Sequence, residues 1–454
     1  MNSEHQKKRS RSIILAVFTS IISKGGNVLL MLLAIPLAYQ VLGEERAAIY
    51  GVMQSLMWLV SMADLGTGPG MVRRLAGAVA EEDKDRQAAV VSTGFFLSLM
   101  LALIAGLLFS ALLAWVPVTT LFSDAFAPYA DELEHTAWVS LAVFLILMVL
   151  ASLERVREGF QEVHIGNTFG SVYNVCAAVV LWLGMSYFHT PVFLVLAVYG
   201  LLIFFCSANV ANLLWKRPWL RPSLKRLDRS VVRGMTREGL ALFAAGSVAP
   251  ILIREAPKFM LGRAGAHAAS DVAHYWILIQ LGLIGMGFIM MVTRPLWPAM
   301  AEAAYRHDYS WIRFARQRMM HLFAPCAVIV VCAFSLLGPW FTSWWLKTNS
   351  GLTRMDLTAY GVLFVLTAWS HMHYVMLGSL GMARAAAKVL LIEAFLILFL
   401  TWWGIQWQGL LGAIVAACAG MVAVSAWAMP LLLGRALRDR SGPRTEAEPV
   451  MVPA

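Results

Sequence analysis

The chain has 454 residues, of which 59% are hydrophobic and 14% are charged, and its mean hydropathy is +0.69. A soluble domain is nearer to ~45–50% apolar and ~25% charged residues. This composition therefore excludes an ordinary soluble protein and predicts an integral membrane protein. The net charge of +10 could indicate a nucleic-acid binder. Because no aromatic residues are interleaved with the basic clusters in a binding pattern, we expect no nucleic-acid partner.

Apolar runs long enough to cross a bilayer predict an all-α integral membrane protein with about twelve transmembrane helices. The expected spans are 13–42, 47–70, 88–116, 137–153, 166–188, 192–214, 238–262, 274–297, 321–345, 357–379, 389–407 and 409–433. Only Trp407, Gln408 and Gly409 mark the boundary between the last two spans. As one helix these 45 residues would measure roughly 67 Å, twice a hydrocarbon core of about 30 Å, so we predict two helices.

The positions of lysine and arginine predict how the chain crosses the membrane. If the N-terminus is cytoplasmic and Arg294, at the inner end of span eight, is counted as cytoplasmic, 29 of the 36 basic residues fall in cytoplasmic segments, four fall outside and three lie within spans. This asymmetry follows the positive-inside rule. We therefore expect a multi-pass protein of the bacterial cytoplasmic (inner) membrane, with the N- and C-termini cytoplasmic and the basic loops contacting membrane lipids.

A basic, proline-containing segment divides the spans into two groups of six. The expected order is a cytoplasmic N-terminal tail at 1–12, an N-lobe of six transmembrane helices at 13–214, a basic cytoplasmic linker at 215–237, a C-lobe of six transmembrane helices at 238–433 and a cytoplasmic C-terminal tail at 434–454. Span two begins near Tyr50 and carries Gln54. About 225 residues later, span eight has Tyr275 and Gln280 in the matching places. Two such halves in the same direction are typical of a parallel repeat about an axis along the membrane normal.

Little in the chain points to catalysis. The longest segment expected on the outside is 117–136, which is too short for a catalytic domain, and phosphate-loop, nucleophile-elbow and metalloprotease motifs are missing from the sequence. We expect no enzyme activity, no metal site and no cofactor other than a coupling proton or sodium ion. The five cysteines lie in apolar runs, where we expect buried, unpaired side chains: Cys176, Cys206, Cys326, Cys332 and Cys418.

Ionisable residues within spans one and seven are the candidates for function. Such a group costs about 2.5–3.5 kcal/mol at mid-bilayer on insertion scales, so it is rarely kept without a purpose. Lys24 lies about 18 Å into span one, beside two glycines. Arg254 and Lys258 share one face of span seven, Glu255 can pair with Lys258, and Pro257 kinks the helix. We predict Lys24, Arg254 and Lys258 as substrate-binding cations. The alternatives are a glycine-permitted helix contact at Lys24 and an outward-snorkelling Lys258.

Other polar residues in the spans are candidates for coupling or gating. Asp64 precedes a glycine-rich end of span two, where a hinge or cap is the alternative, and Glu255 is a second carboxylate in the membrane. Arg73 and Arg294 stand at inner helix ends, where anchoring at the interface is the alternative. Glu393 is isolated in an apolar run, so a hydrogen bond between helices is as good an explanation as function. Interhelical packing is also expected for four asparagines: Asn167, Asn174, Asn209 and Asn212.

The chain resembles the polysaccharide-biosynthesis, lipid-linked oligosaccharide flippases of the multidrug/oligosaccharidyl-lipid/polysaccharide exporter superfamily. The residues that carry the resemblance are Leu42-Gly43-Glu44, Tyr50-Gly51, Asp64-Leu65-Gly66 and Arg73-Arg74-Leu75-Ala76, and in the second half Lys258-Phe259-Met260-Leu261-Gly262, Tyr275 and Pro295. The resemblance implies a flippase that moves undecaprenyl-diphosphate-linked oligosaccharide across the inner membrane by alternating access. The product would be O-antigen, capsule or exopolysaccharide. It also implies that Lys24 and Arg254 bind the diphosphate or acidic sugars.

Two other functions remain open. A cation-coupled multidrug exporter of the same fold should favour cavity carboxylates, whereas here cations outnumber acids. A membrane glycosyltransferase or polysaccharide polymerase should need a larger outside loop. For the flippase we expect a monomer that works beside a polysaccharide polymerase and glycosyltransferases.

Overall fold

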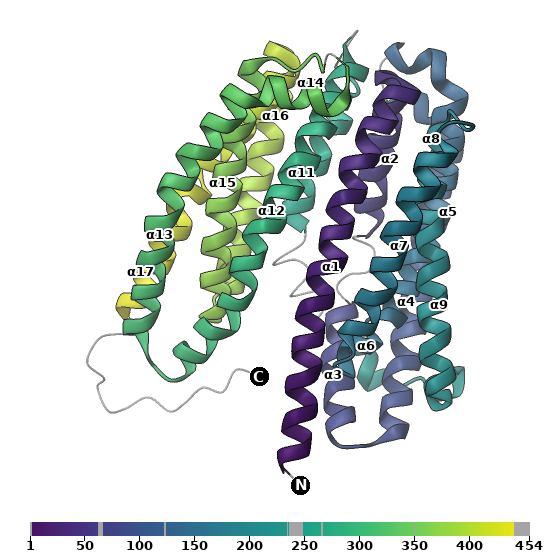
Figure 1. The fold of residues 1–454 in the computed structure, drawn as a ribbon, viewed down its shortest axis with the longest axis vertical. Coiled ribbons are helices and arrows are strands. Elements are labelled where there is room, and N and C mark those ends of the chain that lie inside the picture. Colours follow the sequence, from purple (N-terminus) through teal and green to yellow (C-terminus); the bar gives the residue numbers. More distant parts are fainter. Residues whose placement is uncertain are drawn as a thin grey trace.

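The computed structural model describes residues 2–61, 67–121, 124–233, 235, 248–264, 267–348 and 350–439. The regular secondary structure of these residues is helical (Figure 1). The N-lobe contains α1 (Asn2–Leu42), α2 (Glu44–Ser61), α3 (Thr67–Ala80), α4 (Lys84–Trp115), α5 (Ala130–Glu154), α6 (Val156–Gly159), α7 (Val163–Gly184), α8 (Pro191–Val195) and α9 (Leu201–Lys216). The C-lobe contains α11 (Val248–Leu261), α12 (Ala268–Tyr305), α13 (Tyr309–Cys332), α14 (Gly338–Leu346), α15 (Arg354–Ser379), α16 (Ala383–Ala423) and α17 (Ser425–Asp439). Eight helical stretches are long and apolar enough to cross a membrane, by length and composition.

Short turns connect or interrupt these helices. The 3₁₀ turns are η2 (Val118–Leu121), η3 (Asp124–Tyr129), η5 (Pro218–Leu220) and η6 (Leu224–Arg226). Two π-helical turns, η4 (Leu196–Gly200) and η7 (Ala333–Leu337), join α8 to α9 and α13 to α14. Span two therefore consists of α2 and α3, span six of α8, η4 and α9, and span nine of α13, η7 and α14. The all-α architecture of two lobes is confirmed.

The boundary between the last two spans is also confirmed. α16 is interrupted at Gln408 (φ −148°, ψ 38°) and Gly409 (φ 49°, ψ −123°), so the long apolar run is two helices. The second of these is broken again at Val424 (φ −121°, ψ −79°), after which α17 begins. The positive φ of Gly409 is a backbone conformation that a residue with a Cβ seldom adopts, which explains a glycine at this place.

Several helices extend beyond the spans that the sequence predicts, among them α1, α3, α12 and α13. Residues 2–12, expected as a tail, form the first turns of α1. α3 continues to Ala80 and α12 to Tyr305, although the expected spans ended at 70 and 297. Both extensions are rich in alanine, which has the highest helix propensity, so the helix continues after the hydrophobic run has ended.

The turns that follow α3 and α12 are alike. Glu82 (φ 57°) and His307 (φ 60°) each adopt a left-handed conformation, and each is followed by an aspartate that caps the next helix. Asp83 accepts a hydrogen bond from Arg86 N at 2.9 Å, and Asp308 accepts one from Trp311 N at 3.0 Å. The two turns are separated by about 225 residues, the same spacing as the sequence repeat. The similarity of the lobes therefore extends to their local backbone geometry.

The segment expected as a basic linker packs against the N-lobe. Trp219 Nε1 donates to Gln87 Oε1 at 3.3 Å, and the amides of Ser223 and Asp228 donate to hydroxyl oxygens of α4 at 3.2 Å. Leu220 and Met235 are fully buried in the same place. Polar side chains in the first turns of α4 thus form hydrogen bonds with this segment, for which hydropathy alone predicts only a loop.

Two of the five cysteines correct the sequence-based expectation. Cys206 is buried and Cys176 and Cys418 are half-buried, but Cys326 and Cys332 are exposed. Both exposed cysteines lie on α13, whose most apolar stretch has no buried residue within the described part of the protein. Apolar sequence therefore predicted burial in protein wrongly here, because in a membrane protein an apolar helix face can be turned toward lipid.

A buried arginine organises the N-lobe at the end that carries Asn2. Arg157 is 2% exposed, and its guanidinium donates to Asn209 Oδ1 at 2.6 Å, to Asn212 Oδ1 at 3.0 Å and to Glu162 Oε2 at 3.3 Å. Glu162 also accepts from Arg217 at 2.6 and 3.0 Å. The packing role predicted for Asn209 and Asn212 is confirmed, and Arg157 is a structural cation rather than a headgroup contact.

Replacing Glu162 with glutamine is expected to destabilise the protein by about 1–3 kcal/mol at neutral pH, because two arginines lose their shared anion. Burial alone would raise the pKa of Glu162, but Arg217 and Arg157 outweigh it and lower the pKa from its usual 4.5. The stabilisation from this group is therefore complete above about pH 4.5 and is lost as the pH falls through the lowered pKa. Thermal unfolding of both proteins in detergent at several pH values should show their difference shrinking in acid. A difference that is independent of pH would contradict the prediction.

Candidate functional site

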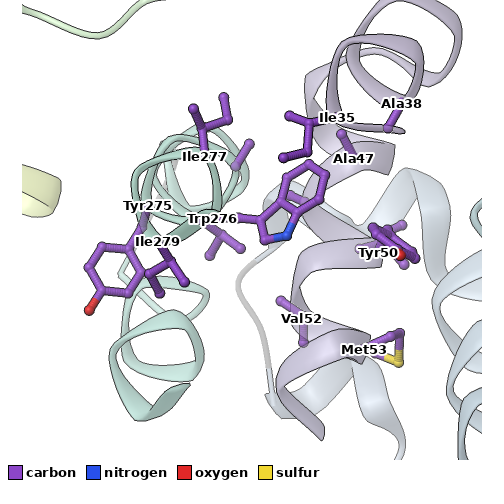
Figure 2. Close-up of a cluster of buried hydrophobic side chains, with 14 of the residues drawn as sticks. Ile35, Ala38, Ala47, Tyr50, Val52, Met53, Tyr275, Trp276, Ile277 and Ile279 are labelled. Atoms are coloured by element: carbon purple, nitrogen blue, oxygen red, sulfur yellow. The ribbon is translucent and has the colours of Figure 1, made fainter. Parts of the chain in front are cut away.

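The two lobes meet where α2 faces α11 and α12. We call this contact the interlobe junction and define it by Gly51 and Gln54 of α2 with Lys258, Trp276 and Gln280 of the C-lobe. A Cβ atom at Gly51 would lie 2.8 Å from Cγ of Trp276, so only glycine allows this approach. Figure 2 shows the Trp276 indole pointing from α12 toward α2, near Ile35, Ala47 and Tyr50. Trp276 is 1% exposed, so the junction excludes water at this point.

Gln54 is the centre of the hydrogen bonds at the interlobe junction. Its Oε1 accepts from Trp276 Nε1 at 3.0 Å and from Gln280 Nε2 at 2.6 Å. Its Nε2 donates to the hydroxyl of Tyr199 in the N-lobe at 3.0 Å. Gln54 and Gln280 are the residues that the sequence repeat pairs with each other. Their direct contact is what a two-fold relation between the lobes produces near its axis.

The charged residues of α11 form one buried group at the interlobe junction. Lys258 is fully buried; its Nζ lies 3.0 Å from Glu255 Oε2 and donates to the carbonyl oxygen of Gly51 at 3.3 Å. Arg254 Nε lies 2.5 Å from Glu255 Oε1 and is the more exposed cation, at 25%. The predicted pairing of Glu255 with Lys258 is confirmed. Lys258 does not reach the surface, because its ammonium group is held by α2 of the other lobe.

Further contacts between the lobes lie at the same end of the molecule. Trp345 Nε1 of α14 donates to the carbonyl of Leu32 at 2.8 Å, and Gln40 Nε2 of α1 donates to Leu346 O at 3.1 Å. A histidine of α12, His274, lies 2.9 Å from Glu44 of α2. Toward the end that carries Asn2, the helices of the two lobes diverge (Figure 1). The lobes are therefore joined at the end opposite Asn2.

Lys24 lies on α1 in a turn that packs closely against α7. Asn174 Nδ2 donates to Ser23 O at 2.9 Å, and a Cβ atom at Gly26 would lie 3.3 Å from atoms of Asn174. A Cβ at Gly25 would meet nothing within 4 Å. The glycine-permitted helix contact expected beside Lys24 is therefore present, at Gly26. Lys24 itself is half-buried, and the contact with α7 sets the rotation of α1 that places it.

Replacing Gly26 with valine is expected to destabilise the N-lobe by about 1–3 kcal/mol, because the side chain must displace Asn174 from its bond to Ser23. The matched control is Gly25→Val, which adds the same side chain one residue earlier, into open space. Both proteins can be compared by thermal unfolding in detergent. Equal unfolding temperatures for the two variants would show that this contact does not limit stability.

The other predicted site residues lie wholly or partly outside the described part of the structure. Asp64 lies outside the described residues, and Arg73 and Arg294 lie on α3 and α12 with side chains outside the described part. Of the seven candidates, the structure brings together Arg254, Glu255 and Lys258. Among the described residues, no cluster of three His, Cys, Asp or Glu side chains could hold a metal ion. Sequence reasoning missed Gly51 and Trp276, although the repeat had already marked Gln54 and Gln280.

Comparison with known proteins gives no matching family model and no matching curated protein. Solved structures do match. An inward-facing multidrug resistance MATE family transporter of the MOP superfamily covers 93% of this chain and 100% of its own, with a TM-score of 0.73 and 16% identity. The chain has the MATE transporter fold.

Two further solved structures are similar to the chain over most of its length. An outward-facing multidrug resistance MATE family transporter covers 96% of this chain and 97% of its own, with a TM-score of 0.65 and 16% identity. A MOP superfamily transporter from Pyrococcus furiosus gives a TM-score of 0.66 at 15% identity, with the same coverage. For that protein, the reverse polarity of the binding pocket suggests a different function. At these identities the MATE fold is established, and the flippase family stays a prediction.

Proposed function

We propose that the protein is a multi-pass membrane transporter that works by alternating access and is inward-facing in this structure. Its lobes contact one another at the end opposite Asn2, and the positive-inside rule predicts that the Asn2 end is cytoplasmic. The TM-score of 0.73 with an inward-facing transporter, against 0.65 with an outward-facing one, supports the same conformation. The interlobe junction is then the outer gate, which must separate when the transporter opens outward.

The proposed cargo is an undecaprenyl-diphosphate-linked oligosaccharide, moved across the inner membrane for surface polysaccharide. The observation that carries this choice is the charge on the first span of each lobe. Lys24 is the only charged residue from 13 to 42, and α11 has two cations that share one carboxylate. Span one and α11, the outer part of span seven, each therefore carry a net positive charge. Guanidinium and ammonium groups suit phosphate oxygens, so these spans favour an anionic cargo.

In this proposal Lys24 and Arg254 bind the diphosphate in the inward-facing state. Lys258 is bound to Gly51 and Glu255 in this state, and it becomes available to cargo only when the interlobe junction opens. Asp64 and Glu255 are the candidates to bind a coupling proton or sodium ion, and Arg73 and Arg294 are candidates for gating. Opening of the junction would thus release Lys258 at the moment when the cargo has to move outward.

The test replaces Lys24 or Arg254 with alanine in the protein's own host. Surface polysaccharide should be lost while the amount of protein in the membrane stays normal. Arg263→Ala is the matched control, because Arg263 is an exposed arginine in the turn that follows α11. Unchanged polysaccharide in both variants would overturn the assignment of these two cations.

A multidrug exporter is the alternative, because two of the matching structures are multidrug resistance transporters. Asp64 and Glu255 would then bind a cationic drug. The pairing of Glu255 with both Arg254 and Lys258 disfavours this role, since the carboxylate is already neutralised. Drug resistance conferred on a sensitised strain, and lost in Glu255→Gln, would decide for the exporter.

A further inference from the structure

A second buried carboxylate lies in the C-lobe, away from the interlobe junction. Glu393 of α16 is 0% exposed, and its Oε2 accepts a hydrogen bond from the backbone amide of Ser425 at 3.1 Å. Ser425 is the first residue of α17, directly after the break at Val424. The hydrogen bond between helices that the sequence allowed for Glu393 is confirmed, and it joins α16 to a helix start.

The break explains why Ser425 needs a partner. The Val424 amide still donates to Gly420 O at 3.1 Å, and the Ala428 amide donates to Val424 O at 3.1 Å. Ser425 N therefore belongs to the first turn of a new helix, whose amides have no acceptor within the helix. Glu393 supplies that acceptor from another part of the chain. Trp369 Nε1 of α15 donates to Ala426 O at 3.0 Å, so the first turn of α17 is held from two helices.

The other carboxyl oxygen of Glu393 is different. Oε1 is buried and makes no hydrogen bond in the described part of the protein. Neighbouring elements offer it no counter-charge there. The Nδ1 atom of His373 on α15 is hydrogen-bonded to Trp369 O. Arg254 and Lys258 of α11 are paired with Glu255. The first ionisable group of α17 is Arg435. The side chain of Arg294 on α12 lies outside the described part.

Two effects oppose each other at Glu393. Burial removes the ion from water, and this favours the neutral carboxylic acid. The hydrogen bond from the Ser425 amide, at the positive end of the α17 dipole, favours the carboxylate. Because Oε1 makes no hydrogen bond in the described part of the protein, a proton can bind there while Oε2 stays at the Ser425 amide.

We propose that Glu393 is a proton-binding site whose occupancy sets the geometry of the α16–α17 break. The carboxylate holds Ser425 N firmly, while a proton from solvent, bound at the free Oε1, weakens that bond and loosens the start of α17. A hard metal ion is a poorer occupant, because such ions take about six or more oxygen ligands and the described residues provide one carboxylate here. This site includes neither Asp64 nor Glu255.

The experiment uses the full-length protein in lipid nanodiscs. Infrared spectra recorded from about pH 5 to about pH 9 should show the loss of a carboxylic-acid C=O band from one group, with a matching gain of carboxylate absorption. Glu393→Gln should abolish this change. Glu393→Asp, which keeps the acid and shortens the side chain, should shift its midpoint. The control is Glu45→Gln, which removes an exposed carboxyl of α2 and should leave the change intact.

Hydrogen exchange at the α16–α17 break provides the second readout. After correction for the intrinsic effect of pH, the peptide containing Ser425 should exchange faster at low pH in the wild type and at one rate in Glu393→Gln. If that variant does not fold, the Glu393→Asp midpoint shift and the wild-type exchange profile still test the proposal. A titrating band that persists in Glu393→Gln, or pH-independent exchange at Ser425 in the wild type, would overturn it.

Discussion

Gly51→Ala is expected to separate the lobes at the interlobe junction. The added Cβ would lie 2.8 Å from Cγ and 3.1 Å from Cβ of Trp276. The indole cannot simply rotate away, because its Nε1 is bonded to Gln54 and its ring packs edge-on against Tyr50, with centroids 5.5 Å apart. Overpacking of this kind costs about 1–3 kcal/mol. A change of that size in the free-energy difference between two conformations shifts their populations by about 5–150-fold.

The shift can be measured as a distance between the two lobes. Spin labels at Glu45 of α2 and Arg263 after α11 report the end of the molecule where the lobes meet, once the exposed Cys326 and Cys332 are replaced by serine. The distance should increase in Gly51→Ala and stay unchanged in Gly287→Ala. The control glycine lies on α12, where a Cβ meets nothing within 4 Å. The same distance distribution in both variants would show that Gly51 does not close the gate.

Lys258→Met is expected to destabilise the inward-facing state by about 3–5 kcal/mol, the usual effect of removing one partner from a buried ion pair. The variant leaves Glu255 with Arg254 alone and removes one donor of the Gly51 carbonyl, which also accepts from Ser55 Oγ at 3.1 Å. The double variant Glu255→Gln/Lys258→Met should be less destabilised than Lys258→Met, because the buried Glu255 Oε2, which loses its cation in the single variant, no longer belongs to a charged group. Arg254, which is partly exposed, can turn toward water in that protein.

Thermal unfolding of the wild type, both single variants and the double variant completes a double-mutant cycle. A large coupling between Glu255 and Lys258 supports a structural role for Lys258 in the closed junction. If the single variants unfold like the wild type and only cargo binding changes, Lys258 is a cargo ligand and the gate assignment is wrong. The comparison thus separates a structural role of Lys258 at the interlobe junction from the cargo-binding role that the sequence predicted.

Local features of the sequence predicted most of the fold. Hydropathy indicated the spans, and the turn residues Gln408 and Gly409 marked a boundary within a continuous apolar run. The ends of α3 and α12 were predicted too early, because hydropathy reports where lipid contact ends and not where helical backbone ends. The exposure of Cys326 and Cys332 was missed for a related reason. An apolar residue of a membrane protein can face either lipid or the protein interior, and hydropathy does not distinguish the two.

The candidate site, like the fold, was predicted from the sequence only in part. Lys24, Arg254, Glu255 and Lys258 were found from sequence, because an ionisable residue inside an apolar run is conspicuous. Their partners were not found, except where they are near in sequence, as Glu255 is to Lys258. Gly51 is 207 residues away from Lys258, and Ser425 is 32 residues away from Glu393. Contacts with backbone groups such as the Gly51 carbonyl and the Ser425 amide cannot be predicted from the residue types in the sequence.

The sequence alone thus determined that this is a two-lobed helical membrane protein, which charged residues stand within its apolar spans and roughly where each helix turns. These properties depend on side-chain hydropathy and charge within one segment of the chain. Only the tertiary structure showed that Lys258 donates to the Gly51 carbonyl of the other lobe and that Glu393 accepts a hydrogen bond from the Ser425 amide at the start of α17. Both facts depend on how helices from distant segments pack, because packing determines which buried polar groups meet and which are left without a partner.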